Sequence, residues 1–136
     1  MDNDLIEFDG GKWEGLSFKD VEKYNAEYYA KWSTNKGTVR CPDGESMEEA
    51  GKRALKAIDK ICKKHDGQTV LISTHGGVLR SLQCLFNGFP MEKLNDMPWT
   101  PNASISIVQY DNGKYKVVQY GITDHLAELS TNLPNF

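Results

Sequence analysis

Two short stretches of this sequence carry the side chains best suited to proton transfer and anion binding. VLISTHGGVLRSL, from Val70 to Leu82, joins an apolar run to a helical pattern through His75, Gly76 and Gly77. DLIEFDGGKWEGLS places Glu7 among glycines near the start of the chain. An imidazole can donate a ring proton to a phosphoryl oxygen, and a carboxylic acid can protonate a leaving alkoxide. Together these residue types would suit the cleavage of a phosphate ester.

His75 sits where a strand pattern gives way to a helix pattern. Residues 69–73, TVLIS, are short, rich in β-branched side chains and apolar through their middle, as in a strand buried on both faces of a parallel sheet. In open α/β sheets, anions bind outside the carboxyl ends of such strands, where turn N–H groups meet the helix dipole. The alternative is a hydrogen-bonded core histidine beside glycines that only permit tight packing. The position of His75 and the pair Gly76 and Gly77 favour a phosphate site, and Arg80, one turn further on, faces either that site or solvent.

Glu7 is the residue best suited to protonate a leaving oxygen. It is followed by Trp13 and Glu14 between glycines. A carboxylic acid in this role works best against apolar groups or near an anionic ligand, because both favour its protonated form. The alternative is a solvated acidic loop, which the spacing alone favours. The stretch becomes informative only beside the His75 stretch.

The remaining histidines give little support for further chemistry. His65 follows two lysines at a helix end, and His125 lies in a Thr-Asp-His-Leu segment near the C-terminus, so both are expected to be structural or solvated. There is no H-E-x-x-H or H-x-H spacing, no G-K-[ST] phosphate loop, no G-x-S-x-G elbow and no G-x-G-x-x-G. We therefore expect neither a metal nor a cofactor.

Helical patterns precede and follow the His75 stretch. Apolar residues at three- and four-residue spacing predict an amphipathic helix from Ser17 to Trp32. Ser46 and Glu49 form the S-x-x-E pattern of a capping box, which predicts a second helix that ends at Asp66-Gly67. After the two glycines the helical period resumes and ends at Asn87-Gly88.

The C-terminal third of the chain reads as a β-hairpin. Residues 103–110 and 115–120 are strand-like on either side of DNGK, in which Asn and Gly tolerate positive φ. Loop 91–99, between the last helix and this hairpin, is expected to help cover the pocket. Helices, a buried strand and a hairpin within 136 residues predict a single α/β domain, residues 1–136.

Composition narrows the classes of partner. A net charge of −3 with no basic face argues against nucleic acid, and no apolar run approaches the ~20 residues that span a bilayer. The start MDNDLIEFDGG lacks the features of a secretory signal or a transit peptide. Three widely spaced cysteines, Cys41, Cys62 and Cys84, suit a reducing compartment. We expect a soluble cytoplasmic protein that binds neither nucleic acid nor membrane.

Four motifs occur in order along the chain: L-x-E-x-x-x-G-x-W-E-G at Leu5 to Gly15, P-D-G-E-S at Pro42 to Ser46, S-T-H-G-G-V-L-R at Ser73 to Arg80, and Pro101-Asn102 before the hairpin. Read together, they resemble the histidine phosphatase superfamily, the phosphoglycerate mutase-like group. The W-E-G form of the glutamate motif looks most like the small α-ribazole phosphatase and broad-specificity phosphatase type.

The resemblance implies a three-layer α/β fold with a mainly parallel sheet, and a phosphomonoester hydrolase that works without a metal or cofactor. In the two-step transfer it implies, a nucleophilic histidine takes the phosphoryl group of a small phosphorylated substrate and water then releases it. Glu7 would be the proton donor, and His75 and the Gly76 backbone would stabilise the transferring group. Asn102 would help to bind the phosphate or substrate.

The sequence departs from the family at its defining motif. The family carries its nucleophilic histidine in R-H-G at the end of its first strand, and no R-H-G occurs here. The chain therefore looks like the last two-thirds of a family member, missing its first strand and inactive alone. An uncovered strand edge favours association. We expect a homodimer, pairing of that edge with another segment, or a truncated form of a longer protein; His125 lacks the neighbours of a substitute nucleophile.

Two other functions fit the same residues. A phosphoglycerate mutase would share the chemistry and pass the phosphoryl group to a second hydroxyl instead of water. A non-catalytic phosphate-binding or interaction module would keep a weak anion site at His75 and Gly76 without turnover.

Overall fold

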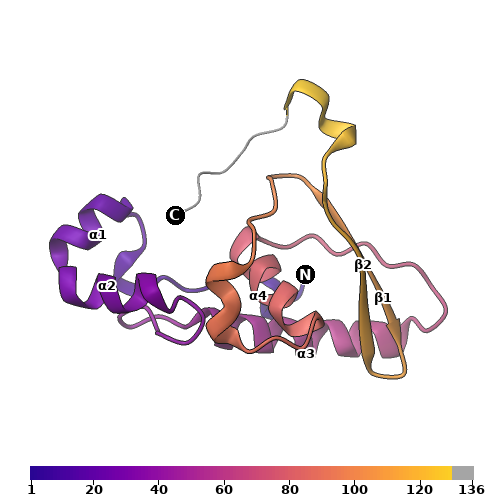
Figure 1. Ribbon diagram of the computed structural model, residues 1–136. Helices are drawn as coiled ribbons and strands as arrows, with labels where there is room; N and C mark the ends of the chain where they lie inside the picture. Colours follow the sequence, from indigo (N-terminus) through magenta and orange to yellow (C-terminus); the bar gives the residue numbers. More distant parts are fainter. Residues whose placement is uncertain (130–136) are drawn as a thin grey trace.

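The computed structural model describes residues 1–129, and two packed helices lie between a lobe of shorter helices at one end and a β-hairpin at the other (Figure 1). Short 3-10 segments of three or six residues accompany the main elements. The elements are the 3-10 segments Asn3–Leu5, Gly11–Trp13, Met91–Asp96 and Asp124–Leu129, the helices α1 (Phe18–Tyr24), α2 (Ala26–Thr34), α3 (Met47–Lys64) and α4 (Gly76–Phe86), and the strands β1 (Ile105–Asp111) and β2 (Lys114–Ile122).

Helix α4 packs along α3 and forms the main core of the molecule. The α3 side of the contact is built from small residues, with Ala50 and Ala54 fully buried. A Cβ added at Gly51 would lie 2.8 Å from Cβ of Ser81, so the two helices touch almost backbone to backbone. Val78 and other apolar α4 side chains fill the space beyond. This close contact fixes the N-terminus of α4 relative to α3.

The predicted start of α3 is confirmed in detail. The Ser46 hydroxyl accepts the Glu49 N–H at 3.2 Å, and the Glu49 carboxylate accepts the Ser46 N–H at 2.8 Å. Such a reciprocal cap satisfies N–H groups that no helical carbonyl can reach. The capping box therefore ties the P-D-G-E-S loop to the helix it precedes.

The predicted single helix from Ser17 to Trp32 is wrong: the segment forms two helices that meet at Asn25. The Asn25 side chain accepts the Tyr28 N–H at 3.0 Å and caps α2, while its own N–H ends α1 on the Val21 carbonyl. An asparagine side chain competes with the backbone for such bonds, which is why it interrupts a continuous apolar period. The two helices form a lobe at the opposite end of the molecule from the hairpin (Figure 1).

The hairpin is confirmed, and within residues 1–129 it is the only sheet. Strands β1 and β2 pair antiparallel around Asn112 and Gly113, whose φ angles of 47° and 81° are those of a tight hairpin turn. Tyr115 joins the hairpin to the helices through a hydrogen bond to Asp59 and a ring contact with Phe86.

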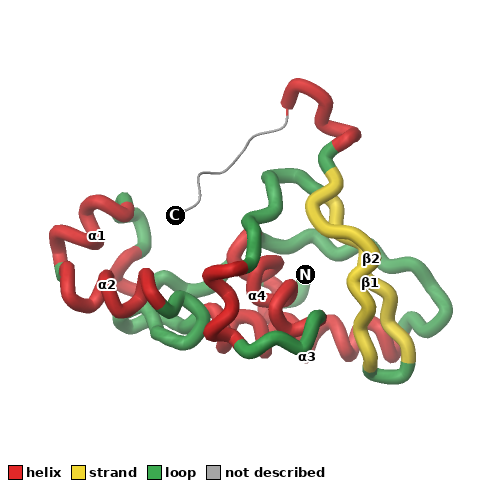
Figure 2. The backbone as a smooth tube through the Cα atoms, viewed as in Figure 1, coloured by secondary structure: helices red, strands yellow, loops and turns green. Residues whose placement is uncertain are grey.

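The predicted buried strand at 69–73 is not a strand in the described residues. This connecting segment, residues 69–73, runs between α3 and α4 as loop (Figure 2), with Val70 42% and Leu71 89% exposed. A parallel strand needs a neighbour to accept its hydrogen bonds, and no segment of residues 1–129 provides one. The parallel sheet that the motifs imply is therefore not formed by these residues alone.

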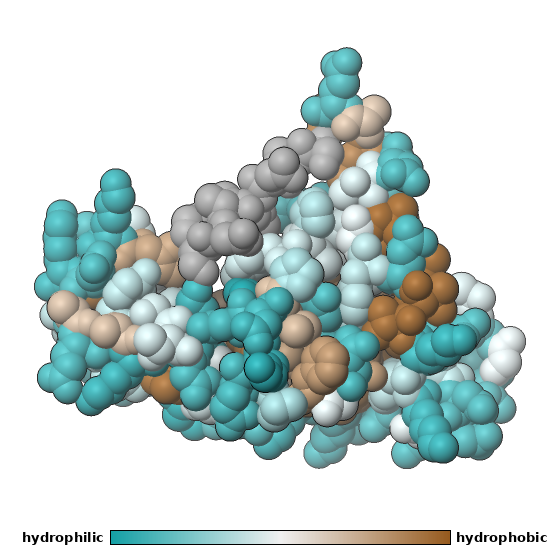
Figure 3. Space-filling view, viewed as in Figure 1, coloured by the Kyte–Doolittle hydropathy of each residue, from teal (hydrophilic) through white to brown (hydrophobic). Residues whose placement is uncertain are grey.

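Apolar side chains also remain exposed on the hairpin. Ile105, Ile107 and Val118 are each between 44% and 50% exposed. On the face seen in Figure 3, hydrophobic surface gathers around the hairpin. Within the described residues, no helix is both long enough and apolar enough to cross a membrane.

Candidate active site

The Glu7 carboxylate lies on the N-terminus of α4, directly beside the His75 stretch. Its oxygens accept the backbone N–H of Gly77 at 3.1 Å and of Val78 at 3.2 Å, and that of Phe8 at 3.0 Å. These donors and the positive end of the helix dipole hold a carboxylate in one place. The two stretches singled out in the sequence are thus brought together, and Glu7 is not in a free solvated loop.

The two glycines after His75 serve different purposes. A Cβ on Gly77 would lie 2.7 Å from Glu7 Oε1 and 2.7 Å from a ring carbon of Phe8, so only glycine lets this carboxylate reach the helix. A Cβ on Gly76 would lie 3.5 Å from the Trp99 ring, an ordinary contact. Tight packing explains Gly77, while the packing around Gly76 leaves room for a side chain.

His75 is the N-cap residue of α4, and its ring is exposed. Its backbone is extended, with φ −115° and ψ 164°, and its carbonyl accepts the Leu79 N–H at 2.9 Å. Within residues 1–129 the imidazole makes no hydrogen bond. The alternative of a buried, hydrogen-bonded core histidine is therefore wrong, and the ring is available to a ligand.

One backbone donor of the α4 N-terminus is left over. Gly77 and Val78 donate to Glu7 and Leu79 donates to the His75 carbonyl, so among the described residues Gly76 N–H alone in this turn has no acceptor. The Gly76 N–H belongs to the residue directly after His75, in the first turn of α4. The site thus offers an N–H donor and an imidazole next to a fixed carboxylate.

Trp99 covers this end of α4, as expected for part of loop 91–99. Arg80 faces neither the site nor solvent: it is 5% exposed and its guanidinium stacks 4.7 Å above the Trp99 ring. It also donates to the carbonyls of Met97 at 3.0 Å and Asn95 at 3.3 Å. Burial lowers the pKa of Arg80 from its usual value. Arg80 therefore shapes the covering loop and is not a phosphate ligand in this arrangement.

Asn102 is exposed in the turn before β1, three residues after Trp99. Ala103, next to it, has φ 56°, and the His125 ring lies 3.0 Å from the Ala103 carbonyl. In the described part of the chain no hydrogen bond joins Asn102 to Glu7 or His75. Its role in binding stays a prediction.

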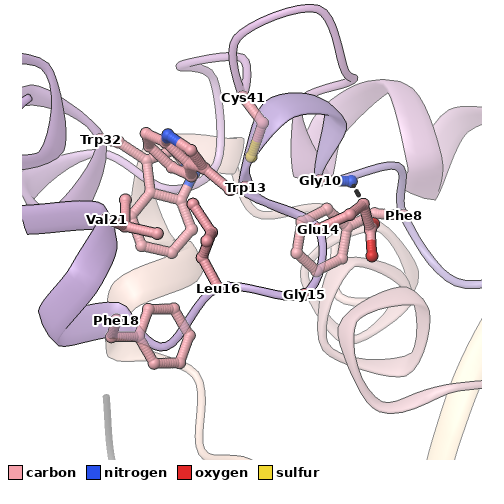
Figure 4. Close-up of a pocket in the computed structure, with 10 residues that line it drawn as sticks. All are labelled: Phe8, Gly10, Trp13, Glu14, Gly15, Leu16, Phe18, Val21, Trp32 and Cys41. Carbon is pink, nitrogen blue, oxygen red and sulfur yellow. Dashed lines mark hydrogen bonds between the residues drawn. The ribbon is translucent and has the colours of Figure 1, made fainter. Parts of the chain in front are cut away.

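An aromatic pocket of about 200 Å³ lies on the other side of Phe8 (Figure 4). Trp13 packs edge-on against Trp32 at 5.2 Å between ring centroids, and the Glu14 carboxylate accepts the Gly10 N–H at 2.8 Å. The pocket's walls come from the W-E-G stretch, α1 and α2. Phe8 belongs both to this pocket and to the wall against Gly77.

Arg53 and Glu45 are residues that the sequence analysis missed. Arg53 donates to the carbonyl of Glu7 at 2.9 Å and pairs with Glu45, whose carboxylate also accepts the Asp9 N–H at 2.9 Å. A signal was present, because Arg53 lies three residues after Ala50 and four before Ala57, on the buried face of α3. A charged residue on a buried helix face needs partners.

The other histidines have structural partners, as predicted. His65 caps the end of α3 and its ring contacts the Gln68 side chain at 3.1 Å. His125 contacts the Ala103 carbonyl. Among residues 1–129 no group of three or more potential ligand side chains is placed to hold a metal ion.

The sequence as a whole matches the family description "Histidine phosphatase superfamily (branch 1)" over residues 1–123. This chain belongs to the histidine phosphatase superfamily. The match includes both the Glu7 and the His75 stretches and confirms the predicted family.

Relatives of this histidine phosphatase chain include enzymes with phosphatase names. It is 31% identical over 131 residues to phosphoglycerate mutase-like protein 4 of Arabidopsis thaliana, covering 93% of this chain and 54% of that protein. It is 27% identical over 127 residues to phosphoserine phosphatase 1 of Hydrogenobacter thermophilus, covering 91% of this chain and 58% of that protein.

Solved structures show the same fold. Bacillus stearothermophilus YhfR superposes with a TM-score of 0.85 at 29% identity, covering 93% of this chain and 62% of that one. The α-ribazole phosphatase from Shigella flexneri superposes with a TM-score of 0.73 at 21% identity, covering 89% and 59%. The α/β fold of phosphoglycerate mutase-like proteins is thus confirmed, and the chain spans only about half to three-fifths of the length of these relatives.

Proposed function

We propose that these residues form the proton-donor half of a phosphomonoester hydrolase that works through a phosphohistidine. One observation carries the proposal: the Glu7 carboxylate is fixed at the α4 N-terminus beside the exposed His75 and the Gly76 N–H, which has no acceptor within residues 1–129. Fixed donors at such a place stabilise charge on the oxygens of a transferring phosphoryl group. The relatives named as phosphoserine phosphatases support the same reaction class.

In the first step a histidine nitrogen forms a bond to phosphorus while the bond from phosphorus to the ester oxygen breaks. Glu7 gives its proton to that departing oxygen. His75 and the Gly76 N–H donate to the phosphoryl oxygens, and Asn102 contacts the substrate.

In the second step water attacks phosphorus, the bond from phosphorus to the histidine nitrogen breaks, and the Glu7 carboxylate takes the proton of the water. Inorganic phosphate leaves. Splitting the displacement in two lets one carboxyl group act first as an acid and then as a base. No R-H-G is present in the sequence, so the nucleophilic histidine of this scheme comes from a further polypeptide segment.

The test is hydrolysis of an aryl phosphate and of phosphoserine by the chain, alone and fused to a strand–turn segment that carries R-H-G. The fused protein should hydrolyse both and form a phosphorylated histidine detectable by mass spectrometry, whereas the chain alone should not turn over. His75→Ala should reduce turnover of both substrates. A folded fusion that binds phosphate without hydrolysis would overturn the proposal, as would His75-dependent turnover by the chain alone.

The proposed acid has its own signature. Glu7→Gln removes the proton donor, so we expect phosphoserine hydrolysis by the fused protein to slow by about 10²–10⁴-fold, with a smaller loss on a phenolate leaving group that needs no proton. Steady-state kinetics on both substrates measures the difference. Glu14→Gln is the matched control, since its carboxylate binds Gly10 N–H in the aromatic pocket. Equal losses on both substrates would contradict the assignment.

Two other functions are alternatives to a phosphomonoester hydrolase. The relative named phosphoglycerate mutase-like protein 4 favours a mutase as the second candidate, and product analysis separates phosphate release from transfer to another hydroxyl. The absence of R-H-G favours a non-catalytic phosphate-binding module. Such a module would bind inorganic phosphate at His75 and stay inactive after fusion.

The connecting segment at 69–73 is the proposed association surface. Its exposed Val70 and Leu71 and its lack of ladder partners in the described residues suit an added β-strand, from a second copy of the chain or from another segment. Light scattering that gives a stable folded monomer at high concentration would count against self-pairing.

Free Cys41, Cys62 and Cys84 suit a reducing, cytoplasmic location.

A further inference from the structure

One side chain from α3 holds the backbone before Glu7 and the carbonyl of Glu7 itself. We call residues 4–9 the Glu7 arm. Arg53 Nη1 donates to the carbonyls of Asp4 at 2.9 Å and Ile6 at 3.0 Å, and Nη2 donates to the carbonyl of Glu7 at 2.9 Å. The arm has little regular structure of its own, so these bonds replace the ladder that a strand would have.

Glu45 completes the arrangement from the P-D-G-E-S loop. Its carboxylate accepts Nε of Arg53 at 3.1 Å and Nη2 at 2.5 Å, and it accepts the Asp9 N–H at 2.9 Å. The Glu45 N–H in turn donates to the Asp9 carbonyl at 2.9 Å. Arg53 therefore holds the first part of the arm and Glu45 holds its end, with Glu7 between them.

The Arg53–Glu45 pair is largely buried, and every N–H of the Arg53 guanidinium has an acceptor. The side chains of Arg53 and Glu45 are only 21% and 17% exposed, and Glu45 raises the pKa of Arg53. The planar guanidinium offers five donors in a fixed fork, which matches a bidentate carboxylate and three carbonyls at once. A lysine ammonium at this position cannot span all of these acceptors.

We propose that Arg53 and Glu45 are positioning residues that aim the Glu7 carboxylate at the N-terminus of α4. The inference rests on the proposed role of Glu7 and adds the device that fixes it. Proton transfer depends on placement within hydrogen-bond reach, and a displaced carboxylate loses rate even when the fold persists. The P-D-G-E-S loop thereby acts through the Glu7 arm, without touching substrate.

The test reads the position of the Glu7 carboxylate without any need for turnover. The amide resonances of Gly77 and Val78 report its presence, because both N–H groups donate to it. Glu7→Gln defines the resonance positions without a carboxylate. We expect Arg53→Met and Arg53→Lys to move both resonances toward those positions, with Arg53→Lys moving them less.

Arg40→Met is the matched control. Arg40 also combines an ion pair, with Glu49, and bonds to a backbone carbonyl, that of Gly44, yet it does not contact the Glu7 arm. Its Gly77 and Val78 resonances should stay at the wild-type positions. The same positions in a folded Arg53→Met protein would overturn the proposal.

Glu45→Gln gives a second reading if Arg53→Met does not fold. It keeps the shape of the side chain and an acceptor for Arg53, so the fold is retained while the pair is weakened. We expect intermediate shifts at Gly77 and Val78, and unchanged resonances would overturn the proposal. In the fused protein, loss of kcat with an unchanged KM should accompany the shifts. Shifts without any hydrolysis by the wild-type fusion would leave the positioning device standing and reject the proposed function instead.

Discussion

Two segments flank the N-terminus of α4, and they are held in very different ways. The Glu7 arm is hydrogen-bonded to Arg53 and to Glu45, and the Thr74 hydroxyl donates to the Leu5 carbonyl at 2.7 Å. The connecting segment at 69–73, which leads directly to His75, makes no backbone hydrogen bond to any other segment of residues 1–129. Leu71 in this segment is 89% exposed.

This difference shows which part of the candidate site is stabilised by contacts within residues 1–129 and which part lacks such contacts. The Glu7 carboxylate is placed by contacts within the described residues, from α3, the P-D-G-E-S loop and α4. The histidine side of the site ends in a strand-like sequence without a sheet. Within residues 1–129, the Glu7 side is therefore supported by other parts of the chain, whereas the segment that leads to His75 has no strand to pair with.

The largest difference in stability should appear between two leucine-to-alanine variants, one in the core between α3 and α4 and one in the connecting segment at 69–73. Leu82 is 2% exposed in the core between α3 and α4, so Leu82→Ala should lower the free energy of unfolding by about 2–5 kcal/mol. Leu71→Ala should change it by less than about 0.5 kcal/mol in dilute solution. Urea denaturation of both variants measures the pair. Similar losses would mean that the connecting segment is buried.

A smaller effect should separate the two adjacent glycines. Gly77→Ala places a Cβ 2.7 Å from Glu7 Oε1 and from Phe8, so it should cost about 1–3 kcal/mol of unfolding free energy and push the carboxylate off the helix. Gly76→Ala meets only the Trp99 ring at 3.5 Å and should change stability by less than about 1 kcal/mol. Urea denaturation of the two variants compares their unfolding free energies. A larger loss for Gly76→Ala than for Gly77→Ala would contradict the position of the Glu7 arm against Gly77.

The smallest effect is an alkaline loss of stability at Cys41, which lies next to the Glu45 loop. Burial raises the pKa of the Cys41 thiol from 9.0 to about 11, with Asp9, Glu14 and Glu45 adding to the shift. The unfolded thiol then loses its proton first as pH rises, so the stabilisation present below pH 9 is lost between about pH 9 and 11. At about pH 10 the loss should reach about 1 kcal/mol. Subtracting the stability profile of Cys41→Ala isolates this contribution, and parallel profiles would refute it.

The sequence predicted the elements whose signals are local. The Ser46 and Glu49 cap and the turn at Asn112 and Gly113 depend on neighbouring residues, and both are confirmed. The helix that ends before Asn87-Gly88 is also present, but it starts at Gly76 and so includes both glycines. The single helix to Trp32 fails because the Asn25 side chain caps a new helix, a competition that apolar spacing does not register. Periodicity alone therefore overestimates the continuity of helices.

The site was predicted in part for the same reason. The residue types and the family motifs singled out Glu7 and His75, but not the atoms that hold Glu7. Arg53 is 46 residues away from Glu7 along the chain, and a contact of that length leaves no local pattern beyond a charge on a buried helix face. The prediction of a strand at 69–73 is wrong for residues 1–129. Its apolar residues would be buried only if a second segment paired with it, and the local sequence carries no information about that segment.

Amide hydrogen exchange in dilute solution tests the central comparison most directly. Gly77 and Val78 N–H groups, bonded to Glu7, should exchange at least about tenfold more slowly than the N–H groups of Leu71 and Ile72, which have no acceptor within residues 1–129. Adding a strand-forming segment that carries R-H-G should then slow exchange at Leu71 and Ile72. Equal protection of both pairs in the dilute chain alone would contradict the division between a supported and an open side of the site.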